Sequence, residues 1–258
     1  MNLQNILNDI EKVDADVYER LDHVSRRHVF QGFLKKALAG AAPVAFASML
    51  NKSYAQNNAV VEVLNFALTL EYLEAEFYNL SLARTGLIPA AARPYYEQIA
   101  KHENAHVALL RSALGSAAVS KPTFDFTAKG AIPTVFTDTQ TNYLVAQAFE
   151  DTGVRAYKGQ ATRLIPFNDI LTIALQIHSV EARHAARIRF LRGQKGWITF
   201  DQSPAALINA VYAGDGLTTQ GGVDLVALTG IGGDRVSEAF DEPLTAQQVF
   251  AIAGQFIV

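Results

Sequence analysis

The sequence predicts an all-α protein built around a bundle of four long helices, arranged as two antiparallel hairpins with one long crossover. Four segments of about 25 residues carry apolar side chains at helical spacing. The first two segments are separated by only a few residues, as are the last two, whereas residues 115–138 separate the second from the third. Since 50% of the residues are hydrophobic and 18% are charged, a large buried core is expected.

The first expected hairpin consists of helices over residues 58–84 and 89–114. Asn57 or Asn58 can cap the first helix, and the second has prolines at its start and Gly115 just past its end. The short connection between these helices, which contains Gly86, predicts that they run antiparallel.

The second expected hairpin consists of helices over residues 139–163 and 168–192. Asp138 or Thr139 is the predicted cap of the first of these helices, and Asn168 that of the second. Helices of this length span roughly 37 Å at about 1.5 Å per residue. The crossover over residues 115–138 can cover that distance, because an extended chain reaches about 3.3 Å per residue.

The segments on either side of the bundle, which is assigned to residues 56–196, differ in composition. Residues 197–258 are rich in Gly, Ala, Thr and Asp, and they predict a short helix near 204–213 and a final helix from Thr245. The final helix is apolar enough to pack onto the bundle. We therefore interpret residues 197–258 as an extension of the bundle domain.

Residues 1–55 resemble a twin-arginine export signal, which predicts a periplasmic protein. SRRHVFQGFLKK (25–36) precedes an apolar stretch at 37–50, and the small-x-small pattern of residues 53–55 follows. The apolar stretch is too short for a membrane-spanning helix, so no stable membrane insertion is expected. The alternative is a helical extension that stays attached to a cytoplasmic protein, because residues 3–21 carry apolar side chains at helical spacing.

Charge and cysteine content exclude several classes of function. The formal net charge is −3 and no long basic run is present, which argues against a nucleic-acid partner. The chain has no cysteine, so disulfides, thiolate metal sites and iron–sulfur clusters are excluded. Any metal site must therefore use histidine, carboxylate and water as ligands.

An internal repeat brings polar residues of the two hairpins into register. The stretches KHENAHVALL (101–110) and SVEARHAARI (179–188) each contain a Glu-x-x-His motif, and an offset of 78 superimposes them. An offset of 79 superimposes the preceding helices and selects Glu71 among the three glutamates of its helix. The residues paired in this way are Glu71 with Glu150, Glu103 with Glu181, His106 with His184, and Tyr78 with Tyr157.

The four paired glutamates lie near the middle of their helices, so they reach the same height in the bundle if they face inward. Four buried carboxylates would cost many kcal/mol as bare charges. Protonation could neutralise them, but so could two divalent cations, with two neutral imidazoles completing the ligand set. Oxygen and imidazole ligands without sulfur favour iron or manganese. The metal ligands predicted by this reasoning are Glu71, Glu103, His106, Glu150, Glu181 and His184.

Other interpretations of these residues stay open. A single Glu-x-x-His motif is weak evidence, and the pairs could instead be surface couples on solvated helix faces. Tyr78 and Tyr157 can hydrogen-bond the ligands or be ordinary core residues, and His178 can be an outer partner of the site or a core histidine. His102 is adjacent to Glu103 in the sequence, so its side chain leaves the helix in a different direction and is expected to point away from the site.

The run LNFALTLEYLEAEFY, together with both Glu-x-x-His helices, resembles the ferritin-like domain family that includes desiccation-related proteins. GGVDLVAL and EAFDEPLTAQQVFAIA in the C-terminal segment are similar to that family too, so the resemblance covers roughly residues 58–258. It implies a ferritin-like four-helix bundle that holds two iron or manganese ions. By analogy, Glu103 and Glu181 bridge the ions, while Glu71 with His106 and Glu150 with His184 complete the two sides.

The same resemblance implies redox chemistry toward O2 or peroxide, of the ferroxidase, catalase or oxidase type, in a setting of stress protection. The alternative is a non-catalytic exported protein, structural or desiccation-associated, that keeps the fold. The sequence does not determine the metal, the substrate or whether identical subunits associate.

Overall fold

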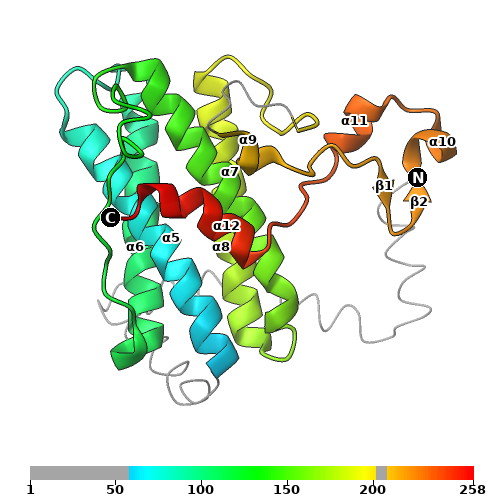
Figure 1. Cartoon of the computed structure of the whole chain (residues 1–258), viewed down its shortest axis with the longest axis horizontal. Coiled ribbons are helices and arrows are strands. Elements are labelled where there is room, and N and C mark those ends of the chain that lie inside the picture. The colour runs from blue at the N-terminus through cyan, green and yellow to red at the C-terminus, as the bar shows by residue number, and fades with distance from the viewer. Residues whose placement is uncertain (1–57, 202–207) are drawn as a thin grey trace, which may run out of the picture. The chain divides into compact units, whose positions relative to one another are not determined.

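The computed structural model describes residues 58–201 and 208–258 and contains four long helices (Figure 1). The predicted export signal lies outside the described residues. One hairpin consists of α5 (Asn58–Ala83) and α6 (Arg93–Leu114), and the other of α7 (Thr139–Leu164) and α8 (Asn168–Leu191). The hairpins pack through α5 against α7 and α6 against α8. The predicted all-α fold with one long crossover is confirmed.

The helix ends follow local sequence signals with two differences from the prediction. Asp138 caps α7, because its carboxylate accepts a hydrogen bond of 2.7 Å from the backbone N–H of Thr141. The predicted cap at Asn168 is wrong: Phe167 occupies the N-cap position of α8, and no side chain caps that end. The second helix begins at Arg93 and not at residue 89, since the chain forms turns just before it.

The C-terminal segment contains short elements. Within the described residues, the helix predicted near 204–213 is α9 (Asn209–Tyr212). The following segment holds a two-stranded antiparallel ladder that was not predicted, and two helices of five residues each. A capping box at Thr245 starts the predicted final helix, α12. The bounds of the remaining short elements are η1 (Gly115–Ala117), β1 (Thr219–Gln220), β2 (Val223–Asp224), α10 (Leu225–Thr229), α11 (Gly233–Ser237), α12 (Ala246–Ala253) and η3 (Gly254–Phe256).

Arg155, a fully buried residue of α7, anchors the C-terminal segment to the bundle. Its guanidinium donates hydrogen bonds to the backbone carbonyls of Glu242, Val211 and Ala213. The segment also crosses α7 at Gly159, where a Cβ would lie 1.9 Å from the carbonyl oxygen of Leu244. Glycine is therefore required for this close approach.

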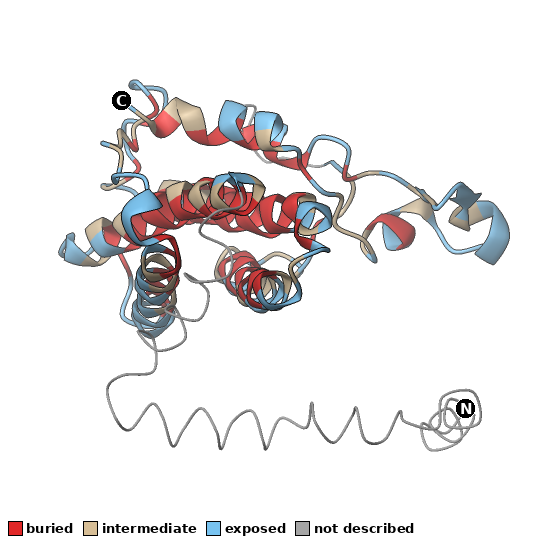
Figure 2. Ribbon diagram, turned by 90° about the horizontal axis from the view of Figure 1, so that it is seen from below, coloured by how far each residue is buried: buried red, intermediate tan, exposed pale blue. Residues whose placement is uncertain are grey.

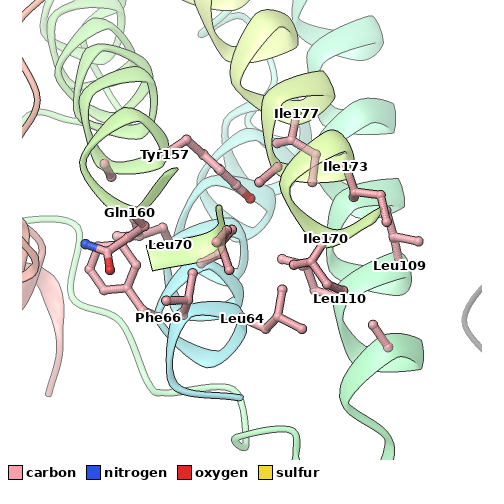
Figure 3. Close-up of a pocket in the computed structure, with 16 residues that line it drawn as sticks. Leu64, Phe66, Leu70, Leu109, Leu110, Tyr157, Gln160, Ile170, Ile173 and Ile177 are labelled. Atoms are coloured by element: carbon pink, nitrogen blue, oxygen red, sulfur yellow. The ribbon is translucent and has the colours of Figure 1, made fainter. Parts of the chain in front are cut away.

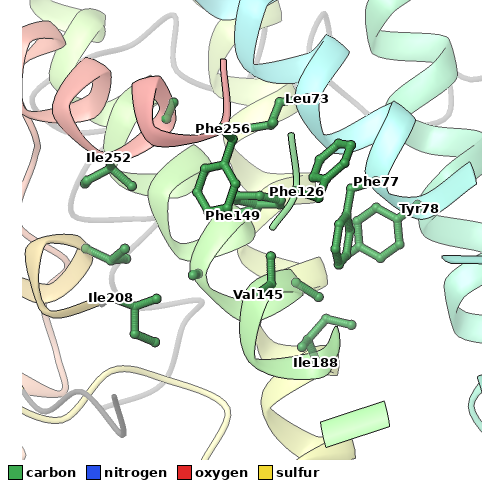
Figure 4. Packing of buried hydrophobic residues seen from close by; sticks show 14 of the residues in the cluster. Leu73, Phe77, Tyr78, Phe126, Val145, Phe149, Ile188, Ile208, Ile252 and Phe256 are labelled. Atoms are coloured by element: carbon green, nitrogen blue, oxygen red, sulfur yellow. The ribbon is translucent and has the colours of Figure 1, made fainter. Parts of the chain in front are cut away.

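The two ends of the bundle have different cores. Toward the start of α5, the core is aliphatic and surrounds a small cavity (Figure 3). Toward the end of α5, phenylalanine and tyrosine rings fill the core together with residues of the crossover and the C-terminus (Figure 4). Buried residues concentrate along the long helices, whereas β1, β2 and α10 are largely exposed (Figure 2). None of the helices in the described part of the chain has the length and apolar character needed to cross a membrane.

Candidate metal centre

Four glutamates, one from each long helix, meet in the middle of the bundle. Glu71, Glu103, Glu150 and Glu181 all have an exposed fraction of 0%, and His106 and His184 are buried beside them. The helical repeat explains this convergence, because each glutamate lies near the midpoint of its helix and on the inward side. The structure thus brings all six sequence-predicted residues together and excludes their interpretation as surface couples.

The six residues form two overlapping groups, each of which could hold a metal ion. Within each group, the potential ligand atoms lie within 4.8 Å of one another. Both groups contain Glu103 and Glu181, so these two carboxylates would be shared if each group held an ion. The first group adds Glu71 and His106, and the second adds Glu150 and His184.

Each imidazole presents one nitrogen to several carboxylates. His106 Nδ1 lies 3.1 Å from Glu71 Oε2 and 3.3 Å from Glu103 Oε2, and His184 Nδ1 lies 2.9 Å from Glu103 Oε1. His106 Nδ1 and Glu181 Oε1 are 3.2 Å apart. A single N–H can point at only one of these oxygens, so the others converge without a proton between them and the ring.

The unsatisfied polar atoms of the cluster fit cation binding. Among the described residues, Glu103 Oε1, Glu150 Oε2, both carboxylate oxygens of Glu181 and His184 Nδ1 are buried without a hydrogen bond. The 2.9 Å contact between Glu103 Oε1 and His184 Nδ1 is therefore close in distance but lacks hydrogen-bond geometry. Such atoms are rare in folded proteins, because each one costs the desolvation free energy of the group. Divalent cations coordinated by these oxygen and nitrogen atoms would satisfy them.

Without cations, protons take their place in the cluster. Burial lowers the pKa of His184, but the surrounding carboxylates, Glu150 foremost, outweigh this effect and raise it to about 12. Burial raises the pKa of Glu103 well above its ordinary range and that of Glu150 to about 7. Burial also acts to raise the pKa of Glu181, but the two imidazoles outweigh it and lower this pKa to about 2. The cluster therefore stores several protons that cations would displace.

Two tyrosines link the halves of the cluster. The Tyr78 hydroxyl, from α5, donates a hydrogen bond of 2.5 Å to Glu150 of α7. The Tyr157 hydroxyl, from α7, donates to Glu71 of α5. Both the tyrosines and the glutamates of these two contacts are pairs of the internal repeat. The contacts orient Glu71 and Glu150, each of which belongs to one of the two ligand groups only.

The two other histidines near the motifs behave differently from the expectation. His102 Nδ1 lies 2.8 Å from His184 Nε2, so the prediction that His102 points elsewhere is wrong. The other nitrogen of His102 contacts Gln98 on the surface. His178 belongs to neither ligand group, and its Nε2 has no hydrogen-bond partner among the described residues.

Glu74 is the residue of the centre that the sequence analysis missed. It is 3% exposed, and burial together with the charges of all four cluster glutamates raises its pKa well above its ordinary range. Its carboxylate faces Gly153, where a Cβ would lie 3.1 Å from Glu74 Oε1 and 3.6 Å from Glu181 Cγ. Gly153 is the counterpart of Glu74 in the internal repeat, so Glu74 has no paired glutamate and was not selected as a ligand. The absence of a side chain at Gly153 leaves the space that the Glu74 carboxylate occupies.

A four-helix bundle with two Glu-x-x-His motifs and a glutamate from each remaining helix defines the class of bundles that build metal sites in their core. The chain belongs to the ferritin-like domain family, whose sequence pattern matches residues 59–194. The matched range contains all six residues of the cluster and ends shortly after α8. No curated protein matches the chain.

Proposed function

We propose that this protein binds two divalent iron or manganese ions and is redox-active toward O2 or peroxide. The observation that carries the proposal is the pair of ligand groups that share Glu103 and Glu181. Four carboxylates and two neutral imidazoles balance the charge of two such ions. When bound, a pair of redox-active ions supplies the two electrons that reduce O2 to hydrogen peroxide, with two protons taken from solvent.

The residues of this chain prepare the centre in three ways. Tyr78 and Tyr157 orient the carboxylates of Glu150 and Glu71 through their hydroxyl groups. His102 fixes the ring of His184 from the side that faces away from the carboxylates. The apolar cores on both sides of the cluster limit the access of water, which strengthens the electrostatic interactions inside.

Elemental analysis of the purified protein, combined with anomalous scattering from crystals, tests the metal assignment. We expect two sites in the wild-type protein. Glu71→Ala should remove the ion near His106, and Glu150→Ala should remove the ion near His184, because each of these glutamates belongs to one group. Glu97→Ala, at an exposed position of α6, is the control and should keep both ions. Two ions bound in both cluster variants would overturn the ligand assignment.

Turnover of Fe(II) with O2, or of hydrogen peroxide, by protein with a known metal content tests the redox part of the proposal. If the protein is fully loaded with metal and shows no turnover, the result would favour the alternative, a non-catalytic exported protein associated with desiccation or stress.

We also propose that the protein is exported and acts in stress protection. Replacement of Arg26 and Arg27 by lysine should keep the protein out of the periplasm if SRRHVFQGFLKK is a twin-arginine signal.

A further inference from the structure

The two halves of the bundle differ in the packing around their equivalent tyrosines. Tyr78 is surrounded by rings: the centroid of Phe77 lies 5.4 Å away and that of Tyr96 5.0 Å away. The ring of Tyr143 follows at 5.8 Å from Tyr96. All four rings are buried and occupy the space around Tyr78, and we call this the filled end of the bundle. Figure 4 shows the rings of Phe77 and Tyr78 side by side there.

At the other end, Tyr157 is the counterpart of Tyr78, but the counterparts of the other three rings are not aromatic. The internal repeat relates Phe77 to Ala156, Tyr96 to Ala174, and Tyr143 to Leu64. All three smaller residues line a cavity of about 20 Å³ beside Tyr157 (Figure 3). The cavity is therefore the space that aromatic side chains occupy in the other half of the molecule.

The cavity offers little to a water molecule. Its walls are apolar side chains of all four long helices, apart from the Tyr157 hydroxyl and Gln160. Neither group exposes polar surface to the cavity. The Tyr157 hydroxyl donates to Glu71, and the Gln160 side-chain carbonyl accepts a hydrogen bond from Arg163. A buried water needs two to four polar partners, so this cavity is suited to a non-polar occupant.

The cavity lies directly next to the candidate metal centre. Leu70, which precedes Glu71 in the sequence, lines it, and so does Ile177, one helical turn before Glu181. The ring of Tyr157 forms a wall of the cavity (Figure 3). The hydroxyl of the same side chain donates a hydrogen bond to Glu71. The Tyr157 side chain therefore connects the wall of the cavity to a carboxylate of the cluster.

We propose that this cavity binds dioxygen and delivers it to the centre from the side of Glu71 and Tyr157. A volume of about 20 Å³ accommodates a molecule slightly larger than water but not a ring or an alkyl chain. Hydrogen peroxide would leave its own donors and acceptors without partners there. This inference rests on the proposed function and selects O2 over peroxide as the oxidant.

Crystals of the full chain under krypton or xenon pressure test the cavity itself, because noble gases bind dry apolar cavities and scatter anomalously. We expect an anomalous peak between Tyr157 and Ala174 in the wild-type protein, with or without metal. Ala174→Tyr should abolish the peak, because it adds the ring that Tyr96 supplies in the other half. Ala174→Leu provides a smaller filling change if the tyrosine variant does not fold.

Oxygen kinetics of the metal-loaded protein test the delivery. The filled variants should have a several-fold higher KM for O2 with unchanged metal content. Ala92→Ile is the matched control: Ala92 is the buried counterpart of the cavity-lining Ile170, so the change adds bulk at the filled end. It should leave the gas peak and the KM unchanged.

The outcomes separate this proposal from the proposed function. O2 consumption without a gas peak in the wild-type protein, or with the same KM in the filled variants, overturns the cavity proposal alone. A gas peak in a fully metal-loaded protein that consumes no O2 overturns the redox function and, with it, the assignment of dioxygen as the occupant.

Discussion

At the scale of single residues, the crossed hydrogen bonds from Tyr78 to Glu150 and from Tyr157 to Glu71 make each half of the centre depend on the other. We expect Tyr157→Phe to weaken binding of the ion near Glu71 by about tenfold, since outer partners of ligands typically contribute 10- to 100-fold. Tyr78→Phe should shift the loss to the ion near Glu150. Calorimetric titration with Mn(II) measures both.

The control for both variants is Tyr72→Phe. Tyr72 is buried and lies on α5, like Tyr78, but its hydroxyl donates to the backbone carbonyl of Val119 and contacts no cluster carboxylate. It should leave both affinities unchanged. Equal losses at both ions in each single variant would show that the hydroxyls act through general destabilisation and not through one carboxylate each.

Glu74 is a test of protonation in the core. Burial and the charges of the neighbouring glutamates raise its pKa well above the ordinary range, which favours the protonated, uncharged carboxyl group. Glu74→Gln, which keeps the shape, should therefore change the free energy of unfolding of the metal-free protein by less than about 1 kcal/mol. Urea denaturation at pH 7 measures this, and a gain of several kcal/mol would mean that the wild-type carboxylate is charged.

Gly153→Ala is the matching change on the opposite helix. The added Cβ at 3.1 Å from Glu74 Oε1 requires the buried carboxyl group to shift. We expect this strain to outweigh the gain of about 0.5–1 kcal/mol that alanine brings inside a helix, with a net loss of about 1 kcal/mol in stability. The loss should be smaller in a Glu74→Ala background, where the space is open. Equal losses in both backgrounds would show that the contact with Glu74 is not the cause.

The pKa shifts also predict how metal affinity depends on pH. Burial raises the pKa of Glu150 to about 7, and the carboxylates raise the pKa of His184 to about 12, so both groups hold protons at pH 6. These protons must leave when cations bind, and affinity therefore rises with pH, by up to about tenfold per pH unit for each proton released. Titrations between pH 6 and 8 in buffers of different ionisation enthalpy measure the release. A constant affinity across this range would contradict the prediction.

At the scale of elements, the sequence predicts the four long helices to within about four residues at each end, because their periodicity and end signals agree. Asp138 caps α7 as expected, whereas α8 begins without a side-chain cap although Asn168 is available. The β1–β2 ladder was missed because strands of two residues carry no periodicity. The path of the C-terminal segment over α7 depends on contacts of Arg155 and Gly159, whose long-range partners the sequence does not reveal.

Gly159 gives a prediction for this docking. In Gly159→Ala, the added Cβ would meet the backbone carbonyl of Leu244 at 1.9 Å, and a backbone atom cannot move aside as a flexible side chain can. We expect a loss of about 2–3 kcal/mol in stability. We also expect faster proteolysis of the C-terminal segment that contains α12. Gly254→Ala is the control, since it lies in the same segment with no atom within 4 Å of its added Cβ.

Gly159→Ala also separates docking from metal binding. Its metal content should stay at the wild-type level, because Leu244 belongs to neither ligand group. Unchanged stability and proteolysis would contradict the requirement for glycine at this crossing.

At the scale of the whole molecule, the internal repeat explains both what the sequence predicts and what it hides. The six cluster residues were found because they obey the repeat. Glu74 and the cavity beside Tyr157 were missed because they arise where the repeat fails, at Gly153 and Ala174. A small residue in the sequence does not show whether a neighbouring side chain fills the space beside it or a cavity remains. These features therefore depend on packing in three dimensions.

Metal binding should stabilise the whole bundle, because the shared carboxylates come from α6 and α8 and the others from α5 and α7. An ion present at 100 times its Kd adds about 2.7 kcal/mol to stability. For a domain of this size, 1 kcal/mol shifts Tm by roughly 2–4 °C, so a chelator should lower Tm by roughly 5–10 °C per ion. In Glu103→Gln/Glu181→Gln, which removes both bridging carboxylates, Tm should not respond to the chelator, whereas Glu97→Gln on the surface should behave like the wild type. A chelator response that survives in the double variant would place the stabilising ion outside the cluster, because neither ligand group retains its bridging carboxylates there.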